Sequence, residues 1–313
     1  MTDGSTIIFL AGPTAAGKTD LAISLVDEFS LGLISVDASQ VYRGLNIGTA
    51  KPAPPVLKKY PHALIDIRDP GEVFSAGAFC KESVQEVRRI AAKRQIPTLV
   101  GGTMFYFSAL TDGLDRLPGA DPQVRHDIEA EAQRLGWPAL HERLELLDPE
   151  AARRIHHNDR QRIQRALEIH DQTRRTLFAR AQEQPGLPDD ARIIRLGLAF
   201  SDRSLLHHRI EQRVDRMLNS GFLAEVGDLV AKGADPQSPA LRSVGYRQAC
   251  QYLNKELDYS KMRERIIFAT RQFAKRQLTW MRNTPGTVWF DAADRDISRI
   301  VGRYLRACLA DQN

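Results

Sequence analysis

The chain has 313 residues, of which 42% are hydrophobic and 27% charged, and its net charge is +5. These values exclude a disordered or fibrous protein and suit one large domain or two of ordinary size. The apolar runs are far shorter than a membrane helix, the first residues lack a signal-peptide pattern, and the three cysteines are widely scattered, so we expect a cytoplasmic protein with no membrane anchor, disulfide framework or zinc site.

The first part of the chain alternates between short apolar strands and helical patterns. Residues 6–11 form an apolar run rich in β-branched side chains, which predicts a buried parallel strand. The same reasoning predicts a helix at 20–29, strands at 32–36, 62–67 and 96–100, a helix at 75–94 and a loop at 44–61. Strands that alternate with helices predict a parallel α/β sheet whose functional groups lie at the carboxyl ends of the strands.

The character of the sequence changes after residue 115. Residues 116–189 carry Arg-, Glu-, Ala- and Leu-rich helical patterns and no convincing strand. A strand at 192–200, helices from 202 onward and a short strand at 287–290 follow. We therefore predict an α/β core formed by residues 1–115 and 190–313, interrupted by an all-helical insertion domain at 116–189.

A phosphate-binding motif lies between the first predicted strand and the first predicted helix. In Gly12-x4-Gly17-Lys18-Thr19 the glycines let backbone N–H groups approach phosphate oxygens, Lys18 adds positive charge, and the Thr19 hydroxyl suits Mg²⁺. The strand–loop–helix context is the one that a P-loop requires, so we expect a P-loop NTPase-like sheet flanked by helices. The residues expected to bind phosphate are Gly12, Thr14, Ala15, Ala16, Gly17, Lys18 and Thr19.

Polar residues follow two other predicted strands at the same edge of the sheet. Asp37 ends the second strand, where a carboxylate can hold Mg²⁺ or act as a general base, although it can equally cap a turn. Thr103 follows Gly101-Gly102 and is either a hydrogen-bonding group in the cleft or the N-cap of the next helix.

The positive charge is concentrated in two segments. Residues 153–180 contain eight arginines against three acidic residues, and residues 261–282 contain seven basic residues against one acid, so the rest of the chain is net acidic. Helical spacing places Gln161 and Arg165 on one face, and Trp280 offers a ring on which a base can stack. The segments indicate a surface for a polyanion such as RNA, with a solvated helix face as the alternative.

Taken together and in order, the motifs resemble those of the bacterial tRNA dimethylallyltransferase family (tRNA isopentenyltransferases). The resemblance spans about residues 7–290. The motifs that carry it are Gly12–Thr19, Asp37-Ala-Ser-Gln-Val-Tyr42, Asn46-Ile-Gly-Thr-Ala-Lys-Pro52, Val100-Gly-Gly-Thr103, Gln161–Arg165, Ser243–Gln248 and Lys275–Arg282.

The resemblance implies transfer of a dimethylallyl group from dimethylallyl diphosphate to the N6 amine of the adenosine immediately 3′ of a tRNA anticodon. It also implies that the P-loop and Arg213 hold the diphosphate, that Thr19 lies near Mg²⁺, and that Asp37 takes the amine proton, with Thr103 beside the reacting base. The implied partner is the anticodon stem-loop, bound by a monomer. The implied tRNA contacts are Asp37, Ala38, Ser39, Gln40, Thr103, Arg125, Gln161, Arg162, Ile163, Gln164, Arg165, Arg242, Ser243, Val244, Gly245, Tyr246, Arg247, Lys275, Arg276, Gln277, Leu278, Thr279, Trp280, Met281 and Arg282.

Two other functions share part of this pattern. A P-loop small-molecule or nucleoside kinase would use the same fold, motif and Mg²⁺, with the Arg-rich insertion as a lid, but it gives Trp280 no role. A non-catalytic, nucleotide-gated RNA-binding protein explains the basic segments but gives Asp37 no role.

Overall fold

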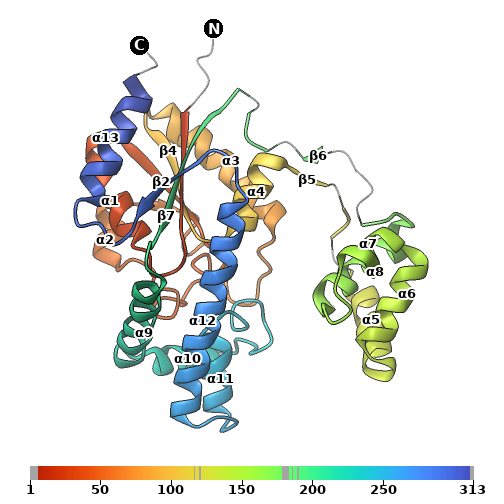
Figure 1. Cartoon of the computed structure of the whole chain (residues 1–313). Helices are drawn as coiled ribbons and strands as arrows, with labels where there is room; N and C mark the ends of the chain where they lie inside the picture. The colour runs from red at the N-terminus through yellow and green to blue at the C-terminus, as the bar shows by residue number, and fades with distance from the viewer. Residues whose placement is uncertain are drawn as a thin grey trace. The chain divides into compact units, whose positions relative to one another are not determined.

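A computed structural model describes residues 6–115, 117–119, 121–177, 183–184, 186–188 and 190–310 (Figure 1). The chain divides into two compact units, one formed by residues 1–112 and 186–313 and the other by residues 113–185. The limits expected for the insertion, residues 116 and 189, lie outside the described residues.

The larger unit contains a six-stranded sheet in which every strand pairs in parallel with its neighbours. The order across the sheet is β3-β2-β4-β1-β7-β8, so the first strand is an interior one. The predicted α/β fold with a parallel sheet is confirmed. The strands are β1 (Thr6–Ala11), β2 (Leu31–Val36), β3 (His62–Ala63), β4 (Ile96–Gly101), β7 (Arg192–Ala199) and β8 (Thr287–Asp291).

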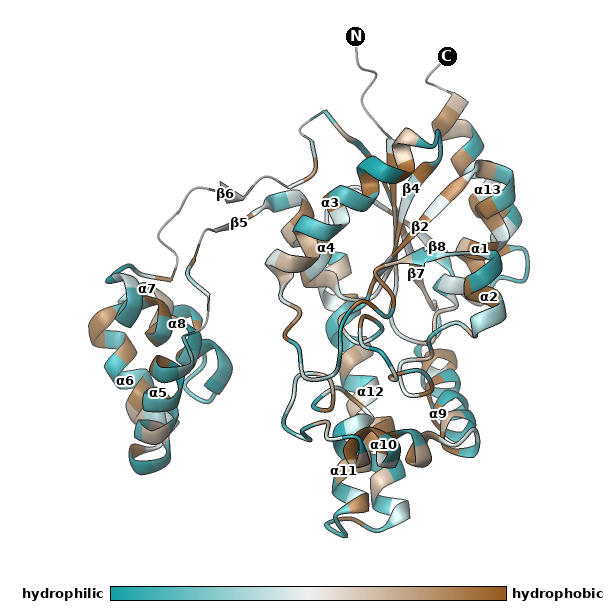
Figure 2. Cartoon of the chain, turned by 180° about the vertical axis from the view of Figure 1, so that it is seen from behind, coloured by the Kyte–Doolittle hydropathy of each residue, from teal (hydrophilic) through white to brown (hydrophobic). Residues whose placement is uncertain are grey.

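Helices cover both faces of this sheet (Figure 1). Successive strand residues point to opposite faces, so Leu10 packs with α1 and α13 in one buried cluster, whereas the ring of Phe9 lies 4.9 Å from Phe107 of α4 on the other face. In Figure 2 the strands are brown over much of their length, whereas the helices alternate between brown and teal. The covering helices are α1 (Lys18–Phe29), α3 (Ala76–Ala92), α4 (Met104–Asp112) and α13 (Ile297–Ala310).

Four further helices belong to this unit: α9 (Arg203–Asn219), α10 (Phe222–Ala231), α11 (Tyr246–Leu253) and α12 (Tyr259–Arg282). Three lie beyond the carboxyl ends of the strands, and the long α12 runs from them back alongside the sheet toward α4 (Figure 1). The side chain of Asp258 caps α12 by accepting a hydrogen bond from the Lys261 N–H at 2.8 Å. Buried residues recur every three or four positions along α12, from Met262 to Met281, so one stripe of the helix faces the protein and the other faces solvent.

The second unit has a separate hydrophobic core. Its helices α5 (Pro122–Leu135), α6 (Trp137–Leu147), α7 (Pro149–Arg154) and α8 (Arg160–Thr173) bury Ile128, Leu140, Leu144 and Leu167 together. The unit is not all-helical, because β5 (Leu114–Asp115) and β6 (Glu183–Gln184) form a short antiparallel ladder. Two residues per strand are too few to give a periodic hydrophobic pattern, which is why the sequence did not reveal them.

Two predictions for residues 44–67 were wrong. The expected loop contains the short helix α2 (Pro54–Lys59), which starts on two prolines that suit the first helical turn. The expected strand 62–67 is reduced to β3, because Leu64 and Asp66 adopt positive φ angles of 65° and 55° that a strand cannot accommodate.

No helix in the described part of the chain combines the length and apolar character needed to cross a bilayer. The three cysteines are free thiols, and Cys80 and Cys250 are buried.

Candidate functional site

The P-loop joins β1 to α1 and has a backbone suited to an anion. Ala15 and Gly17 have positive φ angles of 65° and 80°, and Gly17 is the N-cap of α1. Such a backbone lets consecutive N–H groups converge on an anion at the positive end of the helix dipole. The Lys18 side chain folds back over the loop and donates to the Pro13 carbonyl oxygen at 2.8 Å.

Three charged side chains from different elements lie within electrostatic range at this loop. The pKa of Lys18 is lowered to about 8, chiefly by loss of hydration on burial; Asp37, at the end of β2, opposes this shift, and Arg213 of α9 adds a smaller lowering effect. Burial likewise lowers the pKa of Arg213, and Asp37 again acts in the opposite direction. Two cations and one carboxylate give the site net positive charge, which favours a polyanion such as diphosphate.

The lowered pKa of Lys18 predicts a pH dependence of anion binding. Below pH 8 the free protein carries the Lys18 charge, and above pH 8 it loses the charge, so we expect affinity for inorganic diphosphate to fall by up to about tenfold per pH unit above pH 8. Titration calorimetry between pH 6.5 and 9.5 measures this. The Lys18→Arg variant stays charged throughout, so its profile corrects for ionisation of diphosphate itself, and parallel profiles for the two proteins would contradict the prediction.

The ends of β2 and β4 form a second polar cluster. The Asp37 Oδ1 atom accepts hydrogen bonds from the N–H groups of Ser39 at 2.8 Å and Gln40 at 3.1 Å, which fixes the carboxylate in a turn. The Thr103 Oγ1 atom accepts from the Ala38 N–H at 3.1 Å, and the Thr103 N–H donates to the Val36 carbonyl oxygen at 3.1 Å. Asp37 and Thr103, predicted from separate motifs, are therefore joined through the same turn.

Gln277 of α12 connects the P-loop to the end of β4. Its Oε1 atom accepts from the Thr14 N–H at 2.9 Å, and its Nε2 atom donates to the Gly102 carbonyl oxygen at 2.8 Å. The side chain is 4% exposed. A Cβ atom at Gly102 would lie 2.2 Å from the Gln277 Nε2 atom, so the absence of a side chain at Gly102 makes room for the bridge.

Comparisons with known proteins show the family of the chain. The pattern that describes the IPP transferase family matches residues 40–284. A tRNA dimethylallyltransferase of Thioalkalivibrio sulfidiphilus is 50% identical to the chain over 299 residues, which cover 95% of the chain and 93% of that protein. The chain belongs to the tRNA dimethylallyltransferase family. A tRNA dimethylallyltransferase of Coxiella burnetii is 48% identical over 96% of the chain and 97% of its own length.

Solved structures of the family have the same fold. The full-length tRNA isopentenylpyrophosphate transferase of Bacillus halodurans superposes with a TM-score of 0.72 at 32% identity and covers 98% of each chain. A eukaryotic dimethylallyltransferase, described as acting on tRNA, superposes with a TM-score of 0.80 at 25% identity over 99% of this chain and 81% of its own.

The residues of the larger unit that are predicted to contact tRNA differ in solvent exposure. Exposed residues can reach RNA, and their contacts stay predictions. The contacts of the partly buried residues also stay predictions; these residues are Ser39, Gln40, Thr103, Ser243, Val244 and Leu278. The exposed residues are Ala38, Arg242, Arg247, Lys275, Arg276, Thr279, Trp280 and Arg282. The Trp280 ring, 42% exposed, also lies edge-on to the exposed ring of Phe105, with the centroids 6.3 Å apart.

The side chains of several other predicted contacts are buried. Ile163, Tyr246 and Met281 are at most 1% exposed, so RNA cannot reach their side chains in this conformation. Gly245 is buried as the N-cap of α11, and Gln277 serves the bridge described above. The other predicted contacts in their motifs are exposed or partly buried, because a helix turns every third or fourth position toward its core.

In the smaller unit the predicted contacts surround a buried carboxylate. Glu168, with no exposed side-chain surface, accepts from Arg125 Nε at 2.7 Å and pairs with Arg165 at 3.5 Å. Arg165 also donates to the Pro118 carbonyl oxygen at 2.7 Å, and Gln164 donates to Glu129 at 2.8 Å. Two guanidinium groups thus neutralise one buried charge and partly explain this arginine-rich segment. Gln161 and Arg162 are exposed, and the RNA contacts of all these residues stay predictions.

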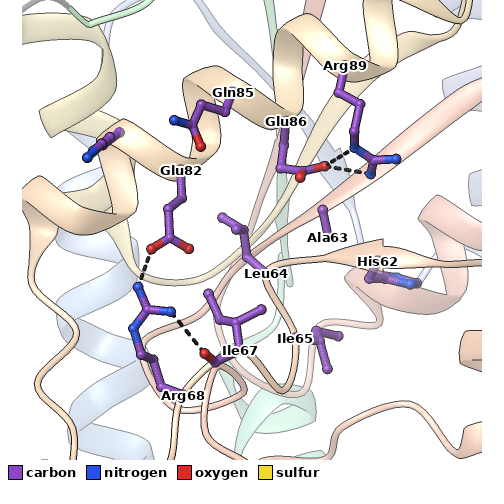
Figure 3. A pocket seen from close by; sticks show the side chains of 11 residues that line it. His62, Ala63, Leu64, Ile65, Ile67, Arg68, Glu82, Gln85, Glu86 and Arg89 are labelled. Atoms are coloured by element: carbon purple, nitrogen blue, oxygen red, sulfur yellow. Dashed lines mark hydrogen bonds and ion pairs between the residues drawn. The ribbon is translucent and has the colours of Figure 1, made fainter.

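A cavity of about 620 Å³ lies apart from the P-loop, between β3 and α3 (Figure 3). Its two arginines are already paired, Arg68 with Glu82 and Arg89 with Glu86. We assign the cavity no part in the chemistry. A smaller cavity of about 200 Å³ adjoins the P-loop and is lined in part by Ala16, Gly17 and Arg209.

Proposed function

We propose that the chain transfers the dimethylallyl group of dimethylallyl diphosphate to the N6 amine of the adenosine immediately 3′ of the anticodon of a tRNA. The amine nitrogen forms a bond to the first carbon of the dimethylallyl group while the bond from that carbon to the diphosphate oxygen breaks. Diphosphate leaves with the electron pair, and the amine proton passes to Asp37. The target base must leave its stack to reach these groups.

The observation that carries the proposal is the convergence of Lys18, Arg213 and Asp37 at the P-loop, in a chain about 50% identical to tRNA dimethylallyltransferases. The two cations stabilise the charge that develops on the leaving diphosphate. A carboxylate that receives the amine proton is worth on the order of 10²–10⁴ in rate, because an exocyclic amine is a poor nucleophile. Thr103, joined to the Asp37 turn, is proposed to lie beside the base.

The residues at the P-loop fit a magnesium ion. The described residues contain no group of three His, Cys, Asp or Glu side chains that could form a metal site by themselves. Mg²⁺ commonly binds with few protein ligands and keeps phosphate oxygens and waters as the others, so the Thr19 hydroxyl together with a diphosphate suffices. The ion would neutralise charge on the diphosphate. We propose that a monomer acts, in the cytoplasm where tRNA is found.

The kinase alternative is not favoured, because the relatives are named as transferases of tRNA. A nucleotide-gated RNA-binding protein would leave the Asp37 cluster without a use. The decisive experiment incubates the protein with unmodified tRNA, dimethylallyl diphosphate and Mg²⁺ and analyses the nucleosides by mass spectrometry. We expect one adenosine, next to the anticodon, to gain a dimethylallyl group. ATP consumption without nucleoside modification would favour the kinase, and tRNA binding without either would favour the binding protein.

The exposed basic residues of α12 predict a salt dependence. Replacing Lys275 and Arg276 by alanine should weaken tRNA binding. It should also reduce the steepness of the plot of log affinity against log salt by about 1 to 2, because a variant that makes fewer phosphate contacts releases fewer counterions when it binds. Filter binding between 50 and 300 mM salt measures the slope. Alanine at Lys58 and Lys59, exposed residues of α2, is the matched control. An equal change in both double variants would indicate a general charge effect and contradict a contact by α12.

A further inference from the structure

Glu225 of α10 binds three consecutive backbone amides of a loop far away in the sequence. Its Oε2 atom accepts from the N–H groups of Asn46 at 3.0 Å and Ile47 at 2.7 Å, and its Oε1 atom accepts from Gly48 at 3.2 Å. The Tyr246 hydroxyl donates to the same Oε1 atom at 2.6 Å. Four donors bind one carboxylate, which has about four lone-pair sites, so the hydrogen-bonding capacity of the Glu225 side chain is filled.

The surroundings of the carboxylate support this arrangement. Burial and the contact with Glu225 raise the pKa of Tyr246, so its hydroxyl remains a donor. A Cβ atom at Gly48 would lie 2.4 Å from the rings of both Phe222 and Tyr246, so the loop packs directly on α10 and α11.

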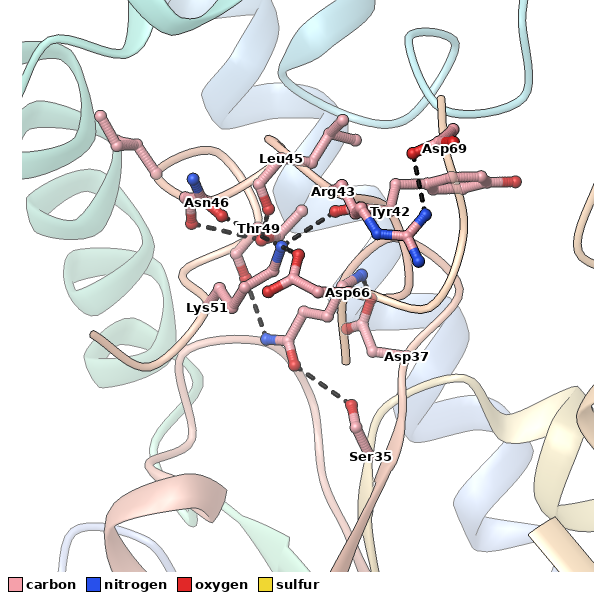
Figure 4. Close-up of polar contacts among 12 residues, drawn as sticks. Ser35, Asp37, Tyr42, Arg43, Leu45, Asn46, Thr49, Lys51, Asp66 and Asp69 are labelled. Atoms are coloured by element: carbon pink, nitrogen blue, oxygen red, sulfur yellow. Dashed lines mark hydrogen bonds and ion pairs between the residues drawn. The ribbon is translucent and has the colours of Figure 1, made fainter. Parts of the chain in front are cut away.

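The other end of the same loop is fixed to the core by Lys51 (Figure 4). The Lys51 side chain is 3% exposed, and its Nζ atom donates to the Tyr42 carbonyl oxygen at 2.9 Å, to Asn46 Oδ1 at 3.0 Å and to Asp66 at 2.5 Å. If the Lys51 side chain moved away from these three acceptors, its buried charge would be left without partners, which is costly. Residues 46–51 are therefore a rigid segment although they form no regular helix or strand.

This segment orients Gln40. The Thr49 carbonyl oxygen accepts from Gln40 Nε2 at 3.3 Å, and the Ser35 hydroxyl donates to Gln40 Oε1 at 3.1 Å, so the two ends of the amide are distinguished. The Gln40 N–H in turn donates to Asp37 Oδ1. A continuous series of contacts thus runs from Glu225 through residues 46–49 and Gln40 to the proposed base.

We infer that Glu225 is a positioning residue for the acceptor side of the reaction: by holding residues 46–48 it sets the orientation of the amide of Gln40, one of the proposed tRNA contacts. The inference rests on the proposed function. The segment 46–49 does not include the P-loop, so the effect should fall on the use of tRNA and spare the binding of diphosphate. A side chain that only stabilised the fold would affect both.

The test is a double-mutant cycle between Glu225→Gln and Gln40→Ala, with kcat and KM measured separately for tRNA and for dimethylallyl diphosphate. Glutamine keeps the size of Glu225 but presents N–H groups to donors. We expect Glu225→Gln to lower kcat/KM for tRNA by about tenfold to a hundredfold and to change the affinity for inorganic diphosphate by less than about twofold. In the Gln40→Ala background the same substitution should lower kcat/KM for tRNA by less than about twofold, because the Gln40 amide through which Glu225 acts is already absent.

Asp228→Asn, which neutralises an exposed carboxylate on the same helix, should match the wild type. If Glu225→Gln does not fold, as judged by its thermal unfolding, Tyr246→Phe removes one of the four donors, keeps the carboxylate, and enters the same cycle. A full loss from Glu225→Gln in both backgrounds, an equal loss of diphosphate affinity, or wild-type use of tRNA would each overturn the inference. Absence of transfer by the wild-type protein would instead refute the proposed function.

Discussion

Asp37→Asn is expected to lower kcat by 10²- to 10⁴-fold while the affinities for tRNA and diphosphate stay within about threefold of wild type. Asparagine retains an Oδ1 atom, so the hydrogen bonds from the Ser39 and Gln40 amides and the turn that they fix can persist. What is lost is the negative charge and the ability to take the amine proton. Single-turnover transfer to tRNA measures the chemical step, and equilibrium binding measures the two affinities.

The measurement belongs at pH 7, because Asp37 helps to keep Lys18 protonated and its removal lowers the pKa of Lys18 further. Asp27→Asn, an exposed carboxylate of α1, is the control for the charge change. Turnover of Asp37→Asn within about threefold of wild type would exclude Asp37 as the base, and a loss of diphosphate affinity equal to the loss of kcat would show that its charge serves the P-loop instead.

The elements of the core that could be predicted are those specified by local pattern. An apolar run, a glycine-rich turn and an amphipathic segment lie within residues 6–29, so β1, the P-loop and α1 follow from neighbouring residues alone. The prediction of a strand at 62–67 was wrong for a local reason: Leu64 and Asp66 have a left-handed backbone, which a hydrophobic pattern does not reveal. The β5–β6 ladder was missed for a non-local reason, because its paired residues are about seventy residues apart in the sequence.

The candidate site divides in the same way. Lys18 and Asp37 could be predicted because each belongs to a motif at the end of a strand, and parallel strands bring such ends together. Glu225 was missed because it contacts backbone amides, which carry no sequence signal, 177 to 179 residues away. Arg125 was predicted as an RNA contact, but the sequence could not show that Glu168 would be buried beside it.

Gln277 was predicted as part of an RNA-binding segment, and the structure places it between Thr14 of the P-loop and Gly102 of β4. Because a buried amide that both accepts and donates has one orientation, it holds the donor loop in a fixed relation to the strand end that carries Thr103. Gln277→Glu keeps the shape, removes the donor to Gly102, and brings a buried negative charge to the loop that receives diphosphate. We expect diphosphate affinity and kcat/KM for dimethylallyl diphosphate to fall by about a hundredfold or more, which corresponds to about 2.7 kcal/mol.

Gln272→Glu introduces the same charge on the exposed face of the same helix and serves as the matched control, with affinities expected within about twofold of wild type. Gln277→Leu, which removes both hydrogen bonds without adding charge, separates the two causes: its loss of affinity reports the loosened loop, and the further loss in Gln277→Glu reports repulsion. A Gln277→Glu variant that binds diphosphate as tightly as Gln272→Glu would show that the bridge has no influence on the donor site. Lower tRNA affinity with unchanged diphosphate affinity would indicate that Gln277 serves tRNA binding, as the sequence predicts.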